Sequence, residues 1–162
     1  MWSNNILETI GQTPLVKLNR LTKGIEATVL VKLEFMNPGG SSKDRIALSM
    51  VAEAESSGDL KEGSSIVEST SGNTGFGLAM VAAVKGYHSI FAIPDKMSAE
   101  KIDALRAFGA EVIVTPTKVE PEDPRSYYSV AKRLAKETEN AVYLDQLNNP
   151  ANPEAHYRTT GP

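Results

Sequence analysis

The fold is decided by the stretch SSIVESTSGNTGFGLAMVAAVKG, residues 64–86, in which a polar loop joins a strand pattern to a helix pattern. Its first five residues form a short run around Ile66 and Val67 that is typical of a buried strand. Its last ten residues are apolar on nearly every side, which predicts a helix buried against a sheet. A strand followed at once by a buried helix indicates a βαβ unit, and βαβ units build parallel sheets.

The same alternation extends along most of the chain. The predicted strands are residues 27–34, 64–68, 89–93, 111–115 and 141–145, and the predicted helices cover residues 46–54, 77–85, 102–108 and 127–135. We expect Gly109 to end the third helix, and Asp123 with Pro124 to begin the fourth. The sequence therefore predicts an α/β fold with a doubly wound, mainly parallel sheet. Residues 13–18 precede this alternation and are expected to form a strand of another packing unit.

Composition excludes several classes of function. The 162 residues are 41% hydrophobic with a net charge of −3, which suits one domain with a core and lacks the basic run of a nucleic-acid partner. The chain has no cysteine and two isolated histidines, so no metal site is expected. The first residues do not form a signal peptide, and no apolar run is long enough to span a membrane. The expectation is a soluble, cytoplasmic chain.

The loop from Ser69 to Gly75, STSGNTG, follows a strand and opens a helix. Ligands of open α/β sheets collect at the carboxyl ends of strands, where the N–H groups and dipole of the next helix attract anions. The loop therefore suits a phosphate or a carboxylate, although a loop of this composition also serves simply as a helix cap. It is neither a Walker loop, nor a dinucleotide fingerprint, nor a nucleophile elbow.

A second unusual loop is NPGGSSKDRIA, residues 37–47, which places Lys43 at the start of a predicted helix. Most lysines in such a position are simply solvated. A cation there opposes the helix dipole, however, so the position favours the neutral amine, which is the nucleophilic form. Both interpretations remain open from Lys43 alone.

Taken together, the two loops resemble the fold-type II pyridoxal-phosphate enzymes of the β-family. The resemblance extends through ILETIGQTPLVKLN (6–19), PDKMSAEKIDALRAFGAEVIVTP (94–116) and DQLNNPANPEAHYRTTGP (145–162). It implies the N-terminal half of a tryptophan synthase β-like catalytic unit. The expected division is residues 1–40, which in the family pack partly with the other half, a small substrate-binding domain at 41–155, and the start of a connection at 156–162.

The resemblance also implies roles for individual residues. Lys43 matches the catalytic lysine that forms a Schiff base with pyridoxal 5'-phosphate, and Asn73 matches the asparagine that binds the cofactor ring. Gln146 matches a glutamine that reaches the substrate α-carboxylate. The loop that receives this carboxylate corresponds to Thr70, Ser71, Gly72, Asn73 and Thr74. Two residues depart from the common pattern: Ser42 replaces a frequent valine, and Ser69 replaces the usual proline.

The implied activity is β-replacement on serine, or an activated serine, by a sulfur nucleophile. The motifs favour the cystathionine β-synthase branch (serine plus homocysteine) over the cysteine synthase branch (O-acetylserine plus sulfide). The expected partners are a small amino-acid substrate and, in the full-length protein, a second subunit of a homodimer. Because the family's phosphate-binding loop lies beyond the matched segment, the alternative is a truncated, inactive α/β fragment.

Overall fold

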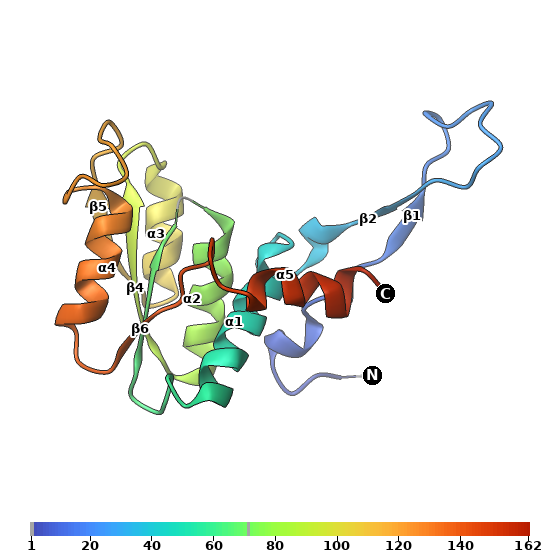
Figure 1. The fold of residues 1–162 in the computed structure, drawn as a ribbon. Helices are drawn as coiled ribbons and strands as arrows, with labels where there is room; N and C mark the ends of the chain where they lie inside the picture. Colours follow the sequence, from blue (N-terminus) through green and yellow to red (C-terminus); the bar gives the residue numbers. More distant parts are fainter. Residues whose placement is uncertain (1, 71) are drawn as a thin grey trace.

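The main sheet has four parallel strands in the order β5-β4-β3-β6 (Figure 1). The structure is a computed structural model that describes residues 2–70 and 72–162. The strands are β3 (Ser65–Ser69), β4 (His88–Pro94), β5 (Glu111–Thr115) and β6 (Ala141–Tyr143). The parallel sheet predicted from the alternating pattern is therefore confirmed for these four strands.

Helices cover both faces of this sheet (Figure 1). On one face lies α4 (Tyr127–Glu137), whose Val130 and Ala131 pack against Val67 of β3. The other face carries α1 (Lys43–Ser57), α2 (Asn73–Lys85) and α3 (Ala99–Ala107). Ile66 of β3 lies in their core, because successive side chains of a strand point to opposite faces. The sheet is thus doubly wound, as predicted.

The N-terminal region forms a separate ribbon that projects from the body (Figure 1). In it β1 (Leu15–Lys17) pairs antiparallel with β2 (Leu30–Lys32). The prediction that 13–18 contain a strand of another packing unit is confirmed. The prediction that 27–34 begin the parallel sheet is wrong: the strand is shorter, pairs with β1, and leads into the 3-10 turn η2 (Glu34–Met36). A β-branched, aliphatic run predicts a strand but not its partner.

The helix ends predicted from glycines agree with the structure, whereas the helix start predicted from Asp123 does not. Gly58 and Gly86 end α1 and α2 in the left-handed conformation that glycine adopts most readily. Gly109 has a φ of +90° just beyond α3, as expected. The helix start predicted at Asp123 is wrong, because Ser126 caps α4 by accepting a hydrogen bond from the Ser129 N–H. Asp123 instead binds the side chain of Arg125.

Both ends of the described chain return to α1. The short helix α5 (Ala151–Ala155) and the π-helical turn η3 (His156–Thr160) pack along it, and the Ser49 hydroxyl donates to the Ala151 carbonyl at 2.9 Å. The 3-10 turn η1 (Ile6–Thr9) buries Leu7 in the same core. Helix α1 is therefore held from several sides, and so is Lys43 at its first turn.

Helices α1 and α2 lie side by side, with a close contact at Gly77. A Cβ atom at this position would lie 2.9 Å from the Ala47 Cβ and 3.2 Å from the Lys43 carbonyl oxygen. Only glycine lets the two helices approach this closely. Asn73 lies one turn earlier on the same face of α2, so the first turns of the two helices are neighbours.

Replacing Gly77 with valine is expected to lower the free energy of unfolding by about 2 kcal/mol, because the added side chain forces the two helices apart. Urea denaturation measures the change. The matched control is Ala83→Val, which introduces the same β-branched residue on the exposed side of α2. An equal loss in both variants would mean that valine's helix propensity, rather than the contact, is responsible.

Candidate functional site

The predicted site residues gather where β3 and β6 end and α1 and α2 begin. All five residues of β3 are buried, because this strand lies between β4 and β6. Its carboxyl end leads directly into the loop 69–74. Gln146 follows the neighbouring β6 and donates its side-chain Nε2–H to the Ser69 carbonyl at 3.3 Å. The Gly77 contact brings the first turn of α1 to the same edge.

Thr70 stabilises the loop from within through hydrogen bonds to its backbone. Its Oγ1 accepts hydrogen bonds from the backbone N–H groups of Gly72 and Gly75, each at 3.3 Å, and its side chain is 2% exposed. The Thr70 methyl group lies 2.7 Å from where a Cβ of Gly75 would stand. Thr70 therefore caps α2 from inside the turn, so the helix-cap interpretation holds for this residue.

The other loop residues lie at the start of α2. Asn73 is its first residue and is exposed, whereas Thr74 is 4% exposed. Gly72 is the N-cap residue and makes no side-chain cap. Ser71, the remaining residue assigned to this loop, lies outside the described residues. A helix N-terminus of this kind presents N–H groups and a positive dipole end toward the edge of the sheet.

Lys43 is the first residue of α1 and is partly buried. Its backbone N–H donates to Ser41 Oγ at 3.1 Å, which fixes the main chain at the helix start. In the part of the chain that the structure describes, no carboxylate forms an ion pair with its Nζ.

The next two residues anchor this turn. Asp44 is fully buried, and its Oδ2 accepts the Gly39 N–H at 2.6 Å. Arg45 forms a two-pronged ion pair with Glu34, both contacts being 2.7 Å, and also donates to the Gly11 carbonyl. The Arg45 guanidinium lowers the pKa of Glu34 to about 2. The pair ties the N-terminal segment to α1 directly beside Lys43.

Glu68 is a functional candidate that the sequence did not single out. It is fully buried at the end of β3, and burial raises the pKa of its carboxyl to about 7. Its Oε1 accepts the Ser69 N–H at 2.8 Å, and its Oε2 accepts the Gln146 N–H at 3.1 Å. The Ser69 hydroxyl meets the Tyr143 hydroxyl at 2.8 Å. The sequence does carry a signal for it, because Glu68 is an acidic residue within a predicted buried strand.

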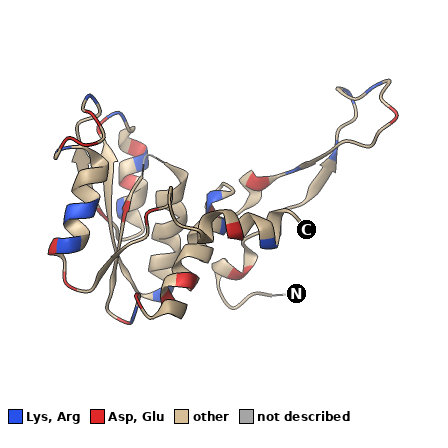
Figure 2. Cartoon of the chain, in the orientation of Figure 1, with Lys and Arg blue, Asp and Glu red and all other residues tan. Residues whose placement is uncertain are grey.

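Charge is otherwise evenly mixed. Figure 2 shows Lys and Arg interspersed with Asp and Glu on the helices and on the ribbon. Within residues 2–70 and 72–162, no cluster of three His, Asp or Glu side chains could hold a metal ion. Over the same ranges, no helix is both long enough and apolar enough to cross a bilayer.

Lys43 at the first turn of α1 and the loop that opens α2 lie together at the carboxyl edge of the doubly wound sheet. The family of pyridoxal-phosphate dependent enzymes matches residues 6–162, and the chain belongs to it. It is 54% identical over 158 residues to a cystathionine beta-synthase of Apis mellifera, covering 96% of this chain and 31% of that protein. It is 52% identical over 158 residues to a probable cysteine synthase of Bacillus subtilis, covering 98% and 50%.

Solved structures agree with this assignment. A hydrogen sulfide-producing enzyme from Fusobacterium nucleatum superposes with a TM-score of 0.88 at 42% identity, covering 99% of this chain and 51% of that one. The fold inferred from sequence, one half of a fold-type II pyridoxal-phosphate enzyme, is thereby confirmed. The chain spans about a third to a half of the length of these relatives.

The residues present fit part of a pyridoxal-phosphate site. The fit rests on the Lys43 amine, which has no acidic partner in the described chain, and on the exposed Asn73 side chain one turn from the α1–α2 contact. An amine can bond the aldehyde, and a carboxamide can hydrogen-bond the ring hydroxyl.

Proposed function

We propose that the chain supplies the lysine and the substrate-carboxylate loop of a pyridoxal-phosphate-dependent β-replacement enzyme of sulfur amino-acid metabolism. One observation carries the proposal: the contact of Lys43 and Ala47 with Gly77 joins the first turns of α1 and α2. This contact puts a reactive amine and an anion-binding helix start on one edge. An α-amino acid carries the Cα–H that must be removed beside its carboxylate, and in this proposal the edge offers a group for each.

In this proposal each residue of the site has a separate role. Lys43 would hold the cofactor aldehyde through its Nζ, and the same amine, when free, would accept the proton from the substrate Cα. Asn73 orients the cofactor ring. The N–H groups and hydroxyls of residues 70–74, together with Gln146, bind the α-carboxylate and so align the Cα–H bond with the amine. When bound, pyridoxal phosphate supplies the electron sink for the charge left at Cα.

The proposed substrates are serine and homocysteine, which makes cystathionine β-synthase the first candidate. Six relatives with this name are 51–54% identical to the chain. The alternative is cysteine synthase, which uses O-acetylserine and sulfide. The Bacillus relative, 52% identical, supports this alternative.

The two activities are separated by one comparison on the full-length protein. We expect serine plus homocysteine to be consumed at least about tenfold more efficiently, as kcat/KM, than O-acetylserine plus sulfide, a difference of about 1.4 kcal/mol in transition-state binding. A preference for the second pair would replace the first candidate with cysteine synthase. Turnover of neither pair would contradict β-replacement itself.

We also propose that residues 1–40 pack against a further unit of the catalytic assembly, that 41–155 bind substrate, and that 156–162 begin the connection.

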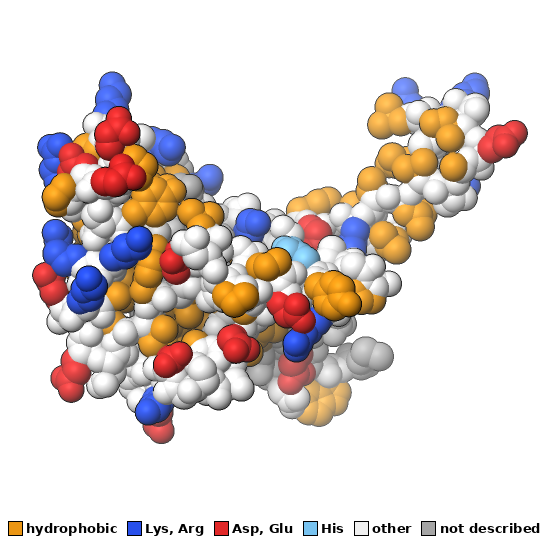
Figure 3. All heavy atoms as spheres, viewed as in Figure 1, with side chains coloured by type: hydrophobic (Ala, Val, Ile, Leu, Met, Phe, Trp, Pro, Cys, Tyr) orange, Lys and Arg blue, Asp and Glu red, His pale blue; other side chains and the backbone are white. Residues whose placement is uncertain are grey.

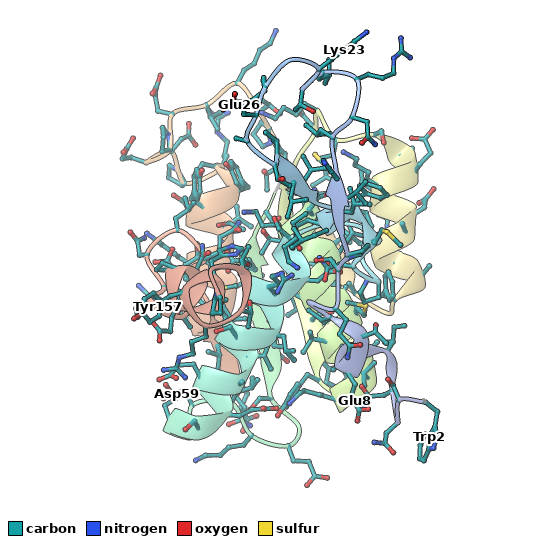
Figure 4. All side chains as sticks on the ribbon, turned by 90° about the vertical axis from the view of Figure 1, so that its right-hand side faces the viewer. Trp2, Glu8, Lys23, Glu26, Asp59 and Tyr157 are labelled. Carbon is teal, nitrogen blue, oxygen red and sulfur yellow. The ribbon has the colours of Figure 1, made fainter. Side chains whose placement is uncertain are left out.

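Large apolar side chains are exposed on the ribbon, among them Leu15, Val16, Leu21 and Leu30. Figure 3 shows orange, hydrophobic atoms along the projecting arm. Figure 4 shows Lys23 and Glu26 at the tip of the ribbon and Tyr157 on η3, where its side chain is exposed. Exposed apolar surface of this extent suits an interface, including that of a homodimer.

A second candidate of another class is a non-catalytic α/β unit. The chain covers 51% of the Fusobacterium enzyme, and the resemblance assigns the cofactor-phosphate loop to a later segment. We therefore expect residues 1–162 alone to bind pyridoxal phosphate weakly and to show no turnover. Strong turnover by the purified 162-residue chain would contradict this candidate.

A further inference from the structure

The pairing of strands β3 and β6 ends beside the proposed carboxylate site. The Leu144 N–H still donates to the Val67 carbonyl at 3.2 Å. Asp145 then takes a left-handed conformation with a φ of 48°, which turns the chain away from β3. Before this turn, backbone hydrogen bonds join β6 to β3. Beyond it, the hydrogen bonds between the two segments involve side chains.

Glu68 makes the central link. One carboxylate oxygen accepts the N–H of Ser69, on its own strand, and the other accepts the N–H of Gln146, across the gap. The Gln146 side chain returns the contact by donating to the Ser69 carbonyl. Glu68 thus joins the start of the substrate loop to the segment that carries Gln146.

We propose that Glu68 is a positioning residue that acts as a proton-dependent latch: its ionised carboxylate holds the Ser69 and Gln146 N–H groups together, and protonation at Oε2 releases Gln146. Oε2 is the site of protonation because its hydrogen bond, at 3.1 Å, is longer than the 2.8 Å bond of Oε1. A protonated oxygen donates its hydrogen and accepts an N–H less well. The consequence for substrate binding rests on the proposed function, whereas the latch itself does not.

The environment of Glu68 sets the pH at which the latch works. Burial, with a smaller contribution from the negative charge of Asp145, outweighs the lowering effect of the hydrogen bonds from Ser69 and Gln146 and raises the pKa of Glu68 to about 7. The Tyr143 hydroxyl, whose own pKa is raised to about 12, stays neutral. On the Ile66 face, α1 and α2 contribute apolar core residues, and the first turn of α1 adds the charged side chains of Lys43, Asp44 and Arg45. Because the folded pKa exceeds the usual 4.5, this group's contribution to stability is full below pH 4.5 and is lost as the pH rises through 7.

This arrangement uses both the backbone N–H and the hydroxyl of Ser69. Its N–H is free to serve Glu68 because the next N–H, of Thr70, makes the bond to Ala92 of β4. Its hydroxyl binds Tyr143. Proline, the usual residue at this position in the resembling family, has neither an N–H nor a hydroxyl. A serine here therefore strengthens the ionised form of Glu68.

The first test follows the Gln146 backbone amide resonance of residues 1–162 by NMR between pH 5.5 and 8.5. We expect it to titrate with a midpoint near 7 in the wild type and not to titrate in Glu68→Gln. Ser69→Pro should raise the midpoint and Asp145→Asn should lower it. The matched Ser69→Ala keeps the N–H and, of the contacts with Glu68, loses only the 3.4 Å contact of the hydroxyl with Oε1, so it should raise the midpoint less than Ser69→Pro. An amide that does not titrate, or that titrates equally in Glu68→Gln, overturns the latch.

The second test measures the KM for the amino acid with the full-length enzyme. Glu68→Gln should raise KM about fivefold at pH 8, the effect of losing one buried hydrogen bond, with kcat unchanged. At pH 6, where the wild type is itself protonated, the two values should agree. A KM that falls at pH 8, or rises equally at both pH values, overturns the positioning role. Failure of the wild type to use amino acids contradicts the proposed function but leaves the amide titration decisive.

Discussion

Replacing Lys43 with alanine is expected to abolish covalent attachment of pyridoxal phosphate to the protein. Lys43 is partly buried at the first turn of α1, and in the described chain its amine forms no ion pair with a carboxylate. In the full-length protein, the same change should lower turnover by at least about a hundredfold, the usual contribution of a positioned base. Reduction of the protein–cofactor mixture with borohydride, followed by peptide mass spectrometry, measures the attachment directly.

The matched control is Lys85→Ala, at the far end of α2, where the lysine binds Glu55 at 2.7 Å on the surface. This variant should bind the cofactor as the wild type does. Equal labelling of wild type and Lys43→Ala would show that another lysine carries the cofactor, and the assignment of Lys43 would be wrong.

Replacing Glu34 with alanine is expected to lower the free energy of unfolding by about 3 kcal/mol, because it leaves the Arg45 guanidinium buried without a counter-ion. The Arg45 side chain is 2% exposed, so water cannot take the place of the carboxylate. Since the pKa of Glu34 is lowered to about 2, the ion pair stabilises the fold fully above about pH 4.5 and is lost as the pH falls toward 2. Urea denaturation at pH 7 measures the loss.

Two further variants isolate the cause. Glu55→Ala removes the carboxylate of the exposed pair with Lys85 and should cost less than about 1 kcal/mol. The double variant Glu34→Leu/Arg45→Met removes both charges and should recover most of the stability, because well-packed apolar residues commonly replace buried ion pairs. If the double variant is as unstable as Glu34→Ala, packing rather than the unpaired charge accounts for the loss.

The parallel sheet and its helices were predictable because each strand and helix carries a local signal. The buried strand at 65–69, the apolar helix after it and the glycines that end α1 and α2 all act within a few residues of sequence. The pairing of residues 30–32 with 15–17 was not predictable, because a short aliphatic run is compatible with any partner. The start of α4 depended on whether Asp123 or Ser126 made the cap, and both are good N-cap residues.

For the site, the two loops were recognisable, but their internal chemistry was not. The sequence places Thr70 in the proposed substrate loop but does not show that its hydroxyl accepts two backbone N–H groups of the same turn. Glu68 meets Gln146 across 78 positions of sequence, and Arg45 meets Gly11 across 34. Contacts of this range depend on tertiary packing, and no local pattern encodes them.

The contact of Gly77 with Lys43 and Ala47 also has a consequence for the energetics of catalysis. Because α1, which bears Lys43, and α2, which follows the proposed carboxylate loop, touch without an intervening side chain, we expect them to move as one body. The relative placement of base and anion site is then fixed during folding, before any amino acid arrives, so substrate binding need not order one against the other. Any opening or closing of the site is therefore expected to carry Lys43 and the start of α2 together.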